Sequence, residues 1–384
     1  MRVYLDNAAT TELTDSVKNY LVSILDDFGN PSSLYGLSEK PKQIISGARQ
    51  SVAKFINADP KDIYFTGGGA SSNTLSIRGF CLRNNCTVFY SPIAHKSILK
   101  CVESYHNSIP LKVNKEGIID IHDLEEYLNV CINTPLVTID YANSEIGTIQ
   151  NVAQIIKITH LHNGIVYLDC TGSMPTIPVD VKKSDVDMLG FSAHKLGGLK
   201  GCGVLYKKKD IVLEPLVYGS QEKGLYGGTE NIFGIASLGK AVERYDYSSV
   251  SSANRDYVYD YIGKNIPDSY LLGAPIESGN RLPHNLYMCF KGTEGESLMI
   301  LLDMNGIQVS TGSACTSGDL TPSTTLSAIG VNEQDIHSCI RMTFGEETEE
   351  ELNYVCETLK HCVESLRNFN NKEIKTTISS GDYE

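Results

Sequence analysis

The sequence predicts an α/β protein that has a large domain, built on a mainly parallel sheet flanked by helices, and a smaller α/β domain. The length of 384 residues, 41% of them hydrophobic and 21% charged, is ordinary for a globular chain of about two domains. Short apolar runs alternate with segments of helical spacing up to residue 245. Such alternation favours a parallel sheet covered on both faces. A polar stretch at 247–254 then precedes a second set of strands and helices.

The first predicted elements lead from the N-terminus towards the sheet. A short strand at 3–5 precedes a helix over about 15–25, which ends at Gly29-Asn30-Pro31-Ser32-Ser33. Asn and Ser at such a break satisfy free backbone groups at turns and helix starts. Residues 37–55 carry apolar side chains at helical spacing and form the next predicted helix.

A glycine turn follows the next strand. The strand at 63–65 runs into Thr66-Gly67-Gly68-Gly69-Ala70-Ser71-Ser72-Asn73, and we expect a helix from about residue 74 to residue 84. A strand, a glycine turn and a helix in this order point free N–H groups and the helix dipole at an anion, usually a phosphate. An ordinary structural turn is the alternative, because no complete Walker or dinucleotide-binding spacing is present.

Polar residues follow three further strands, expected at 87–91, 136–140 and 164–169. They are His95, the run Asn143-Ser144-Glu145, and Asp169. Ligands of open α/β sheets bind beyond the C-terminal strand ends, so we expect these residues to line one pocket with the glycine turn. Each residue also has a plain interpretation, since His95 can be satisfied locally at a helix start and Asp169 can be a cap.

Lys195 lies in an unusual place in Val186–Tyr206, between two apolar runs and just before four glycines at 197, 198, 201 and 203. Glycines there suggest tight turns and close approach of the backbone to another group. A lysine whose amine is partly buried can lose its proton and form a Schiff base with an aldehyde cofactor. The alternative is a surface lysine on a glycine-rich hairpin.

Pyridoxal phosphate would give each of these residues a role. Lys195 would form the Schiff base, and Asp169 would pair with the pyridine nitrogen so that the ring accepts electrons. His95 would cover the ring or move protons. The phosphate would be held by the turn at 67–69 together with Ser192 and His194.

The second half of the chain starts with the glycine-rich loop 219–231 and a helix at 235–245. The smaller domain then contains strands at 285–288 and 306–310 and helices at 295–304 and 349–368.

Two residues of this part are candidates for chemistry. Cys315 lies among Gly, Ser, Ala and Thr in a loop, where a thiolate can act as a nucleophile. Arg341 lies inside the apolar strand 339–343, and a buried guanidinium matches a substrate carboxylate. The alternatives are an ordinary loop cysteine and a structural ion pair.

Composition excludes several other classes of protein. The net charge of −13 argues against a nucleic-acid partner. No run approaches the roughly 20 apolar residues of a membrane span, and the N-terminus does not resemble a signal peptide. Eleven cysteines without a Cys-x-x-Cys pair predict buried thiols rather than disulfides or metal ligands. We therefore expect a cytoplasmic protein with no nucleic acid, membrane or metal as partner.

Several short motifs follow one another in a characteristic order between residues 3 and 365. They are YLDNAATT, GNPSS, AHKS, NSEIGT, the strand that ends at Asp169, FSAHK followed by KGCGVLY, GGTEN, STGSACTSG and IRMTFG. This series resembles that of the cysteine desulfurases, which are pyridoxal-phosphate enzymes of fold type I in the class V aminotransferase group.

The resemblance implies a homodimer that removes sulfur from L-cysteine and gives alanine and a persulfide on the enzyme. It also implies a large cofactor-binding domain at 14–252 and a small domain, made of 1–13 and 253–384, that carries the Cys315 loop. The segment from Thr316 to Gly330 resembles the longer-loop group, which passes its persulfide to an acceptor or scaffold protein.

The resemblance also assigns individual residues. The catalytic ones are Lys195, Cys315 and His95. Substrate would be bound by Arg341 and Asn30. The implied contacts to pyridoxal phosphate are Lys195, Asp169, His95, Gly68, Gly69, Ala70, Ser144, Ser192, His194 and, from the other subunit, Thr229.

Some positions depart from the pattern of the family. Threonine is usual at Ala70, glutamate at Ser71, asparagine at Ser144 and glutamine at Gly172, and arginines are common at Lys223 and Tyr226. The changes at Ala70, Ser144 and Gly172 remove hydrogen bonds to the cofactor, at a cost of about 0.5–1.5 kcal/mol each. Two alternatives follow, namely another class V lyase or aminotransferase, and a weakly catalytic homologue that relays sulfur or binds a scaffold.

Overall fold

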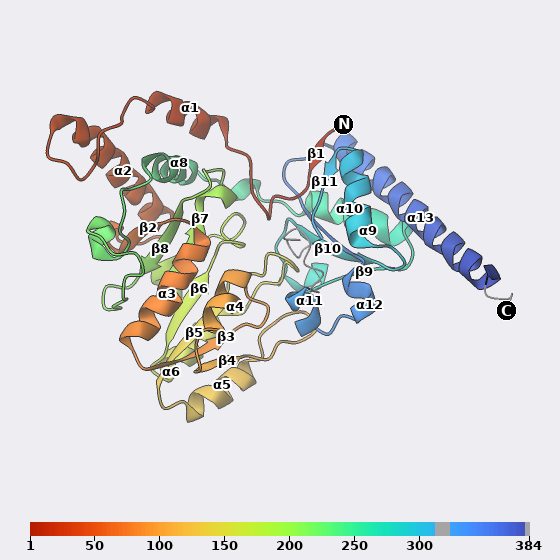
Figure 1. Cartoon of the computed structure of the whole chain (residues 1–384), viewed down its shortest axis with the longest axis horizontal. Coiled ribbons are helices and arrows are strands. Elements are labelled where there is room, and N and C mark those ends of the chain that lie inside the picture. Colours follow the sequence, from red (N-terminus) through yellow and green to blue (C-terminus); the bar gives the residue numbers. More distant parts are fainter. Residues whose placement is uncertain (312–322, 381–384) are drawn as a thin grey trace.

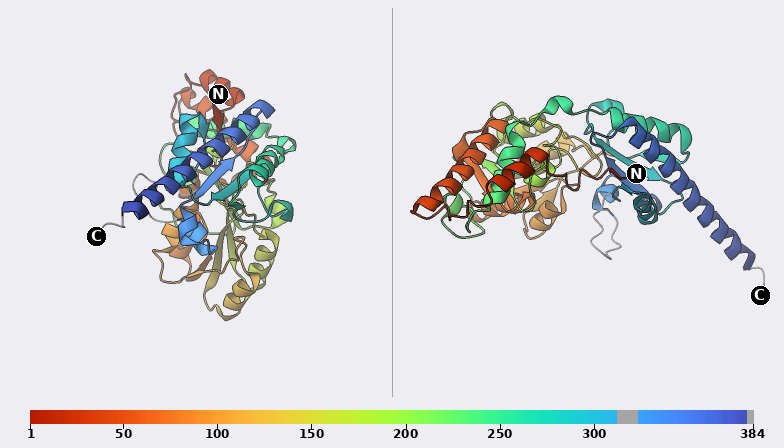
Figure 2. Two further views of the ribbon diagram at one scale, coloured as in Figure 1. Left: turned by 90° about the vertical axis from the view of Figure 1, so that its right-hand side faces the viewer. Right: turned by 90° about the horizontal axis from the view of Figure 1, so that it is seen from above.

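The computed structural model describes residues 1–311 and 323–380, with side chains described as far as residue 369. Two bodies lie side by side (Figures 1 and 2). One contains a seven-stranded sheet, and the other contains a three-stranded sheet together with a two-stranded one. None of the helices in the described residues is long and apolar enough to span a membrane.

The larger sheet is mainly parallel, as predicted. Its strands, in spatial order, are β2 (Ile63–Thr66), β8 (Gly203–Lys207), β7 (Met188–Ser192), β6 (Ile165–Asp169), β5 (Thr134–Asp140), β3 (Cys86–Tyr90) and β4 (Ser108–Pro110). The run from β7 to β4 is parallel, and β8 is antiparallel to both of its neighbours. Every residue of β2 and β7 is buried, which is expected of strands covered on both faces.

Helices cover both faces of this sheet. One face packs against α2 (Glu39–Phe55), α5 (Ile121–Val130), α6 (Val152–Leu161), α7 (Val181–Ser184) and α8 (Ile232–Glu243). The other face packs against α3 (Gly69–Arg83) and α4 (Lys96–Val102). The first helix, α1 (Asp15–Ser23), lies against α8. Short 3-10 turns are η1 (Gly36–Ser38), η2 (Pro60–Asp62), η3 (Ala193–Lys195), η4 (Gln221–Gly224), η5 (Tyr247–Ser249) and η6 (Ile276–Ser278).

The smaller body is built on an antiparallel sheet with the order β12 (Cys339–Thr343), β10 (Asn285–Phe290) and β9 (Ser269–Leu271). The helices α9 (Ala253–Asn265), α10 (Gly295–Met304) and α13 (Glu349–Ser380) share its main apolar cluster. The helices α11 (Thr324–Ala328) and α12 (Glu333–Ile336) pack in a second cluster with β10 and β12. The long helix α13 projects beyond the body (Figure 2).

The N-terminus joins this smaller body rather than the larger sheet. β1 (Val3–Tyr4) pairs in parallel with β11 (Ile307–Gln308), and the side chains of Val3 and Leu5 are buried in its main cluster. The segment that follows Leu5 must therefore cross from one body to the other.

Helix α3 starts five residues before the predicted position. It begins at Gly69, directly after Gly68, whose φ of 142° lies in a region that favours glycine. The helix therefore includes the residues from Gly69 onwards that we had predicted to belong to the turn. As a result, Ala70 and Ser71 lie in the first helical turn, where backbone N–H groups have no acceptor within the helix.

Candidate active site

The candidate site lies where parallel strands of the larger sheet end. β6 ends at Asp169, and β7 is followed at once by η3, which ends at Lys195. The two strands are parallel neighbours, with Asp169 opposite Gly190. The lysine and the aspartate therefore stand at the same sheet edge, where open α/β sheets bind their ligands.

Glycines shape the connection that carries Lys195. Gly197 and Gly201 have φ values of 78° and 77°, which few other residues adopt. A Cβ at Gly203 would lie only 2.6 Å from the carbonyl carbon of Gly68. The start of β8 therefore packs directly against the turn before α3, and the two glycine-rich segments form one wall of the site.

Asp169 is buried and held on both oxygens. The Asn73 side chain donates to Oδ2 at 2.7 Å, and the Thr171 backbone N–H donates to Oδ1 at 2.8 Å. Asn73 also donates to Ser97 Oγ at 2.8 Å and accepts from the Tyr167 hydroxyl at 2.5 Å. The carboxylate orientation is thus fixed by a residue that the sequence analysis did not single out.

His95 caps helix α4 with its ring. Nδ1 accepts the backbone N–H of Ser97 at 3.2 Å and lies 2.7 Å from Ser97 Oγ. Because a backbone N–H only donates, the neutral ring carries its proton on Nε2. Through Ser97, the ring is joined to Asn73 and so to Asp169.

Lys195 is covered by the segment that crosses from the smaller body. Its Nζ donates to the carbonyls of Ala8 and Ala9, the latter at 2.7 Å. Burial is the main cause, and the charge of Arg341 a smaller one, of the lowering of the Lys195 pKa to about 8. The pKa of His194 falls to about 4, first because of burial and then because of Lys195. Roughly a tenth of the lysine is therefore uncharged at pH 7, far more than for a free lysine side chain, and His194 is neutral.

The turn before α3 is lined with hydroxyl groups. Gly69 N–H donates to Ser192 Oγ at 2.8 Å, and Gly67 N–H donates to the Tyr226 hydroxyl at 3.2 Å. A Cβ at Gly69 would lie 2.8 Å from Thr171 Oγ1. That oxygen is buried and has no hydrogen-bond partner among the described residues.

Arg341 is buried and links three parts of the molecule. Its Nη2 donates to Asp6 Oδ1 at 2.7 Å, and its Nη1 donates to the Ser144 carbonyl at 3.1 Å. Its Nε is buried without a partner in the described part of the chain. The structural ion pair considered from the sequence is thus present, and the guanidinium also retains a free donor beside the site.

The chain matches the family model of the class-V aminotransferases over residues 3–355. Cysteine desulfurase IscS from Dictyoglomus turgidum is 39% identical over 380 residues, or 95% of either chain. A solved NifS-like protein has a TM-score of 0.86 at 29% identity, covering 95% of this chain and 100% of that one. A structure of SspA in complex with cysteine has a TM-score of 0.78 at 30% identity, covering 89% and 98%. The chain belongs to the cysteine desulfurases of the class-V aminotransferase family. The predicted fold type I architecture and the predicted enzyme class are confirmed.

The residues of this desulfurase fit pyridoxal phosphate, which its family implies. An amine of lowered pKa and a fixed carboxylate stand at neighbouring strand ends. At the turn before α3, the buried hydroxyl of Thr171 without a partner lies beside Gly69, where any side chain would clash. An anionic group at this turn would meet hydroxyls and free N–H groups, which are the donors a phosphate needs.

Two departures of this desulfurase from the family pattern are neighbours in space. A Cβ at Gly172 would lie 3.1 Å from Cβ of Ser144 and 3.1 Å from the Ala142 carbonyl oxygen. A larger residue at 172 would therefore require the chain around Ser144 to shift. The two changes thus alter one side of the site together.

Two predicted site residues in the described part of the chain do not join this cluster. Asn30 is exposed, and its Oδ1 accepts the backbone N–H of Ser32 at 2.8 Å. Thr229 is also exposed, on the loop 219–231. Cys315 lies outside the described residues.

Glu145 contacts one flank of the 312–322 segment directly and is linked to the other through Tyr287. Ser323 Oγ donates to Glu145 Oε1, and the Tyr287 hydroxyl lies 3.3 Å from the same oxygen. That hydroxyl also donates to the Thr311 carbonyl at 2.8 Å. Residues on either side of the segment that contains Cys315 are therefore tied to the loop that follows β5.

Replacing Glu145 with alanine is expected to slow alanine release from L-cysteine by about 10-fold, because the loss of one hydrogen bond to a charged group costs about 1.5–3 kcal/mol. Glu145→Gln retains the accepting oxygen and should stay within about 3-fold of the wild type. Both variants should bind pyridoxal phosphate normally. Equal activity of Glu145→Ala and the wild type would contradict this role.

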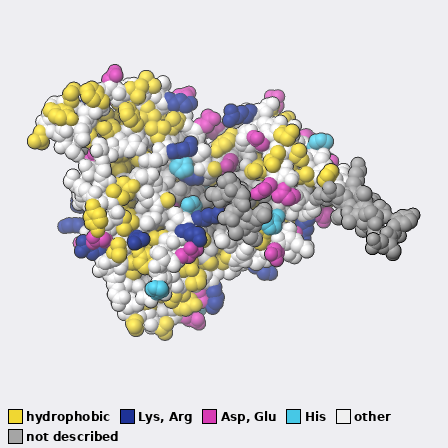
Figure 3. All heavy atoms as spheres, viewed as in Figure 1, with side chains coloured by type: hydrophobic (Ala, Val, Ile, Leu, Met, Phe, Trp, Pro, Cys, Tyr) yellow, Lys and Arg dark blue, Asp and Glu magenta, His cyan; other side chains and the backbone are white. Residues whose placement is uncertain are grey.

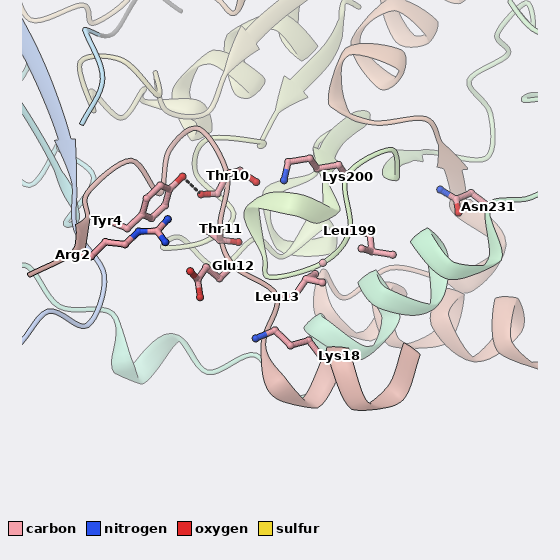
Figure 4. A pocket seen from close by; sticks show the side chains of 11 residues that line it. Arg2, Tyr4, Thr10, Thr11, Glu12, Leu13, Lys18, Leu199, Lys200 and Asn231 are labelled. Atoms are coloured by element: carbon pink, nitrogen blue, oxygen red, sulfur yellow. Dashed lines mark hydrogen bonds between the residues drawn. The ribbon is translucent and has the colours of Figure 1, made fainter. Parts of the chain in front are cut away.

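A separate cavity of about 730 Å³ lies against residues 10–13 of the crossing segment (Figure 4). It is lined by Arg2, Tyr4, Thr10, Thr11, Glu12, Leu13, Lys18, Gly198, Leu199, Lys200 and Asn231. Neither Lys195 nor Asp169 lines it, so it is not the candidate active site.

Proposed function

We propose that this desulfurase uses pyridoxal phosphate, bound at Lys195 and Asp169, to release alanine from L-cysteine. The observation that carries the proposal is the placement of an amine of pKa about 8 and a fixed carboxylate at adjacent ends of β7 and β6. The related structure of SspA in complex with cysteine supports L-cysteine as the substrate.

When bound, pyridoxal phosphate supplies an aldehyde that condenses with amines and a ring that accepts electrons. In this chain, the uncharged amine of Lys195 would attach the cofactor and move a proton at the substrate Cα. Asp169 would hold the ring nitrogen. His95 would face the ring with its protonated Nε2, and the phosphate would be received by Gly68, Gly69, Ala70, Ser192 and His194, with Ser144 on the ring side.

Arg341 and Asn30 are proposed to bind the substrate carboxylate. The support for Arg341 is its buried position beside Lys195, which it influences electrostatically, and the Nε that has no partner in the described residues. A carboxylate on this guanidinium would compete with Asp6, which now accepts from Nη2. Substrate binding would thereby loosen one tie of the crossing segment.

Cys315 is proposed to take the sulfur. Its thiolate attacks the substrate Sγ, a new S–S bond forms, and the Cβ–S bond breaks with its electron pair left on the carbon that becomes the methyl group of alanine. The persulfide sulfur would then pass to a thiol of an acceptor or scaffold protein.

A second copy of the chain is proposed to complete the site. Thr229 is exposed, as expected of a residue that acts in the other subunit. Large apolar side chains are exposed together around α1 and η1 (Figure 3), namely Val22, Leu25, Phe28, Leu34, Tyr35 and Leu37. An apolar patch of this kind marks an interface. We place the large domain at 14–252 and the small domain at 1–13 and 253–384, which agrees with the pairing of β1 and β11.

We also propose the cytoplasm as the location of the protein. Its ten described cysteines are free thiols, which suits a reducing compartment.

The test is alanine release from L-cysteine by purified protein with added pyridoxal phosphate. We expect activity in the wild type and its loss in Lys195→Ala and Cys315→Ser, with the cofactor absorption band lost only in Lys195→Ala. A band without alanine would instead indicate another class V lyase or aminotransferase. Absence of both would indicate a weakly catalytic sulfur-relay or scaffold-binding homologue.

A further inference from the structure

Tyr226 places its hydroxyl against the turn where the cofactor phosphate is proposed to bind. Gly67 N–H donates to this hydroxyl at 3.2 Å. A Cβ at Gly67 would lie 2.9 Å from it and 3.2 Å from Ser71 Oγ. The tyrosine therefore reaches the N-terminal end of α3 from a loop that is distant in sequence.

The hydroxyl of Ser192 makes an equivalent contact two residues further along the turn. It accepts Gly69 N–H at 2.8 Å, just as Tyr226 accepts Gly67 N–H. Each hydroxyl is an acceptor in these bonds, so each keeps its own hydrogen to donate. The N–H groups of Ala70 and Ser71, which follow in the first turn of α3, have no acceptor among the described residues.

The loop that carries Tyr226 is held rigidly. Glu222 is buried and forms two hydrogen bonds with the Arg49 guanidinium, at 2.7 and 2.8 Å. Glu222 and Lys223 have φ values of 46° and 58°, and Leu225 is buried in the cluster beneath α3. The hydroxyl is thus positioned before any ligand arrives, which reduces the entropic cost of binding.

We propose that Tyr226 is a ligand of the cofactor phosphate in this chain. The proposal rests on the proposed function. Ala70 lacks the hydroxyl that threonine usually provides at this turn, and Tyr226 brings a hydroxyl to the same turn in place of a common arginine. The phosphate monoester then receives a neutral donor from the 219–231 loop in addition to Ser192 and the free N–H groups.

The test compares the Kd of pyridoxal phosphate with that of pyridoxal, which lacks the phosphate. Tyr226→Phe should raise the Kd of pyridoxal phosphate by about 10-fold and leave the Kd of pyridoxal unchanged, because only the phosphate contact is lost. Tyr218→Phe is a matched control, since that hydroxyl is on an exposed side chain and bonds Glu214. Both constants are measured by titration of the apoprotein, followed by protein fluorescence and by the bound-cofactor absorption band.

A second variant tests whether a hydroxyl at this turn is what the phosphate requires. Ala70→Thr in the Tyr226→Phe background should restore most of the lost affinity, since it returns a hydroxyl to the turn. The proposal would be overturned if Tyr226→Phe raised the two Kd values equally or changed neither of them. In either case the wild type would still bind the cofactor at Lys195, so the proposed function would stand. A wild type that binds no pyridoxal phosphate would overturn the proposed function, and this inference with it.

Discussion

Replacement of Asn73 by alanine is expected to lower kcat/KM for alanine release by about 100-fold, because it removes the group that positions both Asp169 and His95. The Asn73 side chain is fully buried and uses all of its polar atoms, donating to Asp169 and Ser97 and accepting from Tyr167. Its orientation is unambiguous because a carboxylate only accepts. Alanine at this position would leave the Tyr167 hydroxyl and one Asp169 oxygen without partners.

The two branches of this network can be separated. Ser97→Ala breaks only the branch to His95, so it should reduce the rate and leave the absorption band of the bound cofactor in place. Asn73→Ala also releases Asp169, so the band should shift as the ring nitrogen loses its fixed partner. The control is Asn84→Ala, at the far end of α3, where the side chain donates to the Phe80 carbonyl and has no other hydrogen bond to a described residue. An unshifted band and a normal pH profile in Asn73→Ala would show that the residue has no positioning role.

The framework of the site could be read from the sequence because it depends on local pattern. Strand ends are marked by a switch from apolar to polar residues, and in a parallel sheet these ends lie at one edge. Asp169 and Lys195 meet for this reason. The glycines around Lys195 were equally informative, since positive φ and close backbone approach leave few alternatives.

The contacts that complete the site could not be read in this way. Asn73 was assigned to the end of a turn, and its role depends on α3 starting at Gly69 so that the side chain faces Asp169. Arg341 and Asp6 are far apart in sequence and meet only because β1 crosses to β11. Tyr226 reaches the turn because of backbone angles at 222–224 that no periodic pattern signals.

Replacement of Arg49 by methionine is expected to lower the free energy of unfolding by about 3–5 kcal/mol, since it leaves the buried Glu222 carboxylate without its counter-charge. The side chains of Arg49 and Glu222 are 19% and 4% exposed. The guanidinium also donates to the Ile63 carbonyl at 2.6 Å and lies over the Phe65 ring. After the change, the Phe65 N–H, at 3.0 Å, would be the one remaining donor to the Glu222 carboxylate among the described residues.

Urea unfolding of three variants tests this expectation. Arg49→Met with Glu222→Met should be more stable than Arg49→Met alone, because the double change removes the buried charge together with its partner. Lys100→Met breaks an exposed pair with Glu103 and should cost less than about 1 kcal/mol. If the single and double variants lost equal stability, the energy would come from packing of the arginine stem and not from the ion pair.

Because Tyr226 and Thr229 follow Glu222 on the same loop, the unpaired carboxylate should also weaken pyridoxal phosphate binding. The double variant, which has no carboxylate at position 222 to be drawn into water, should recover part of that affinity.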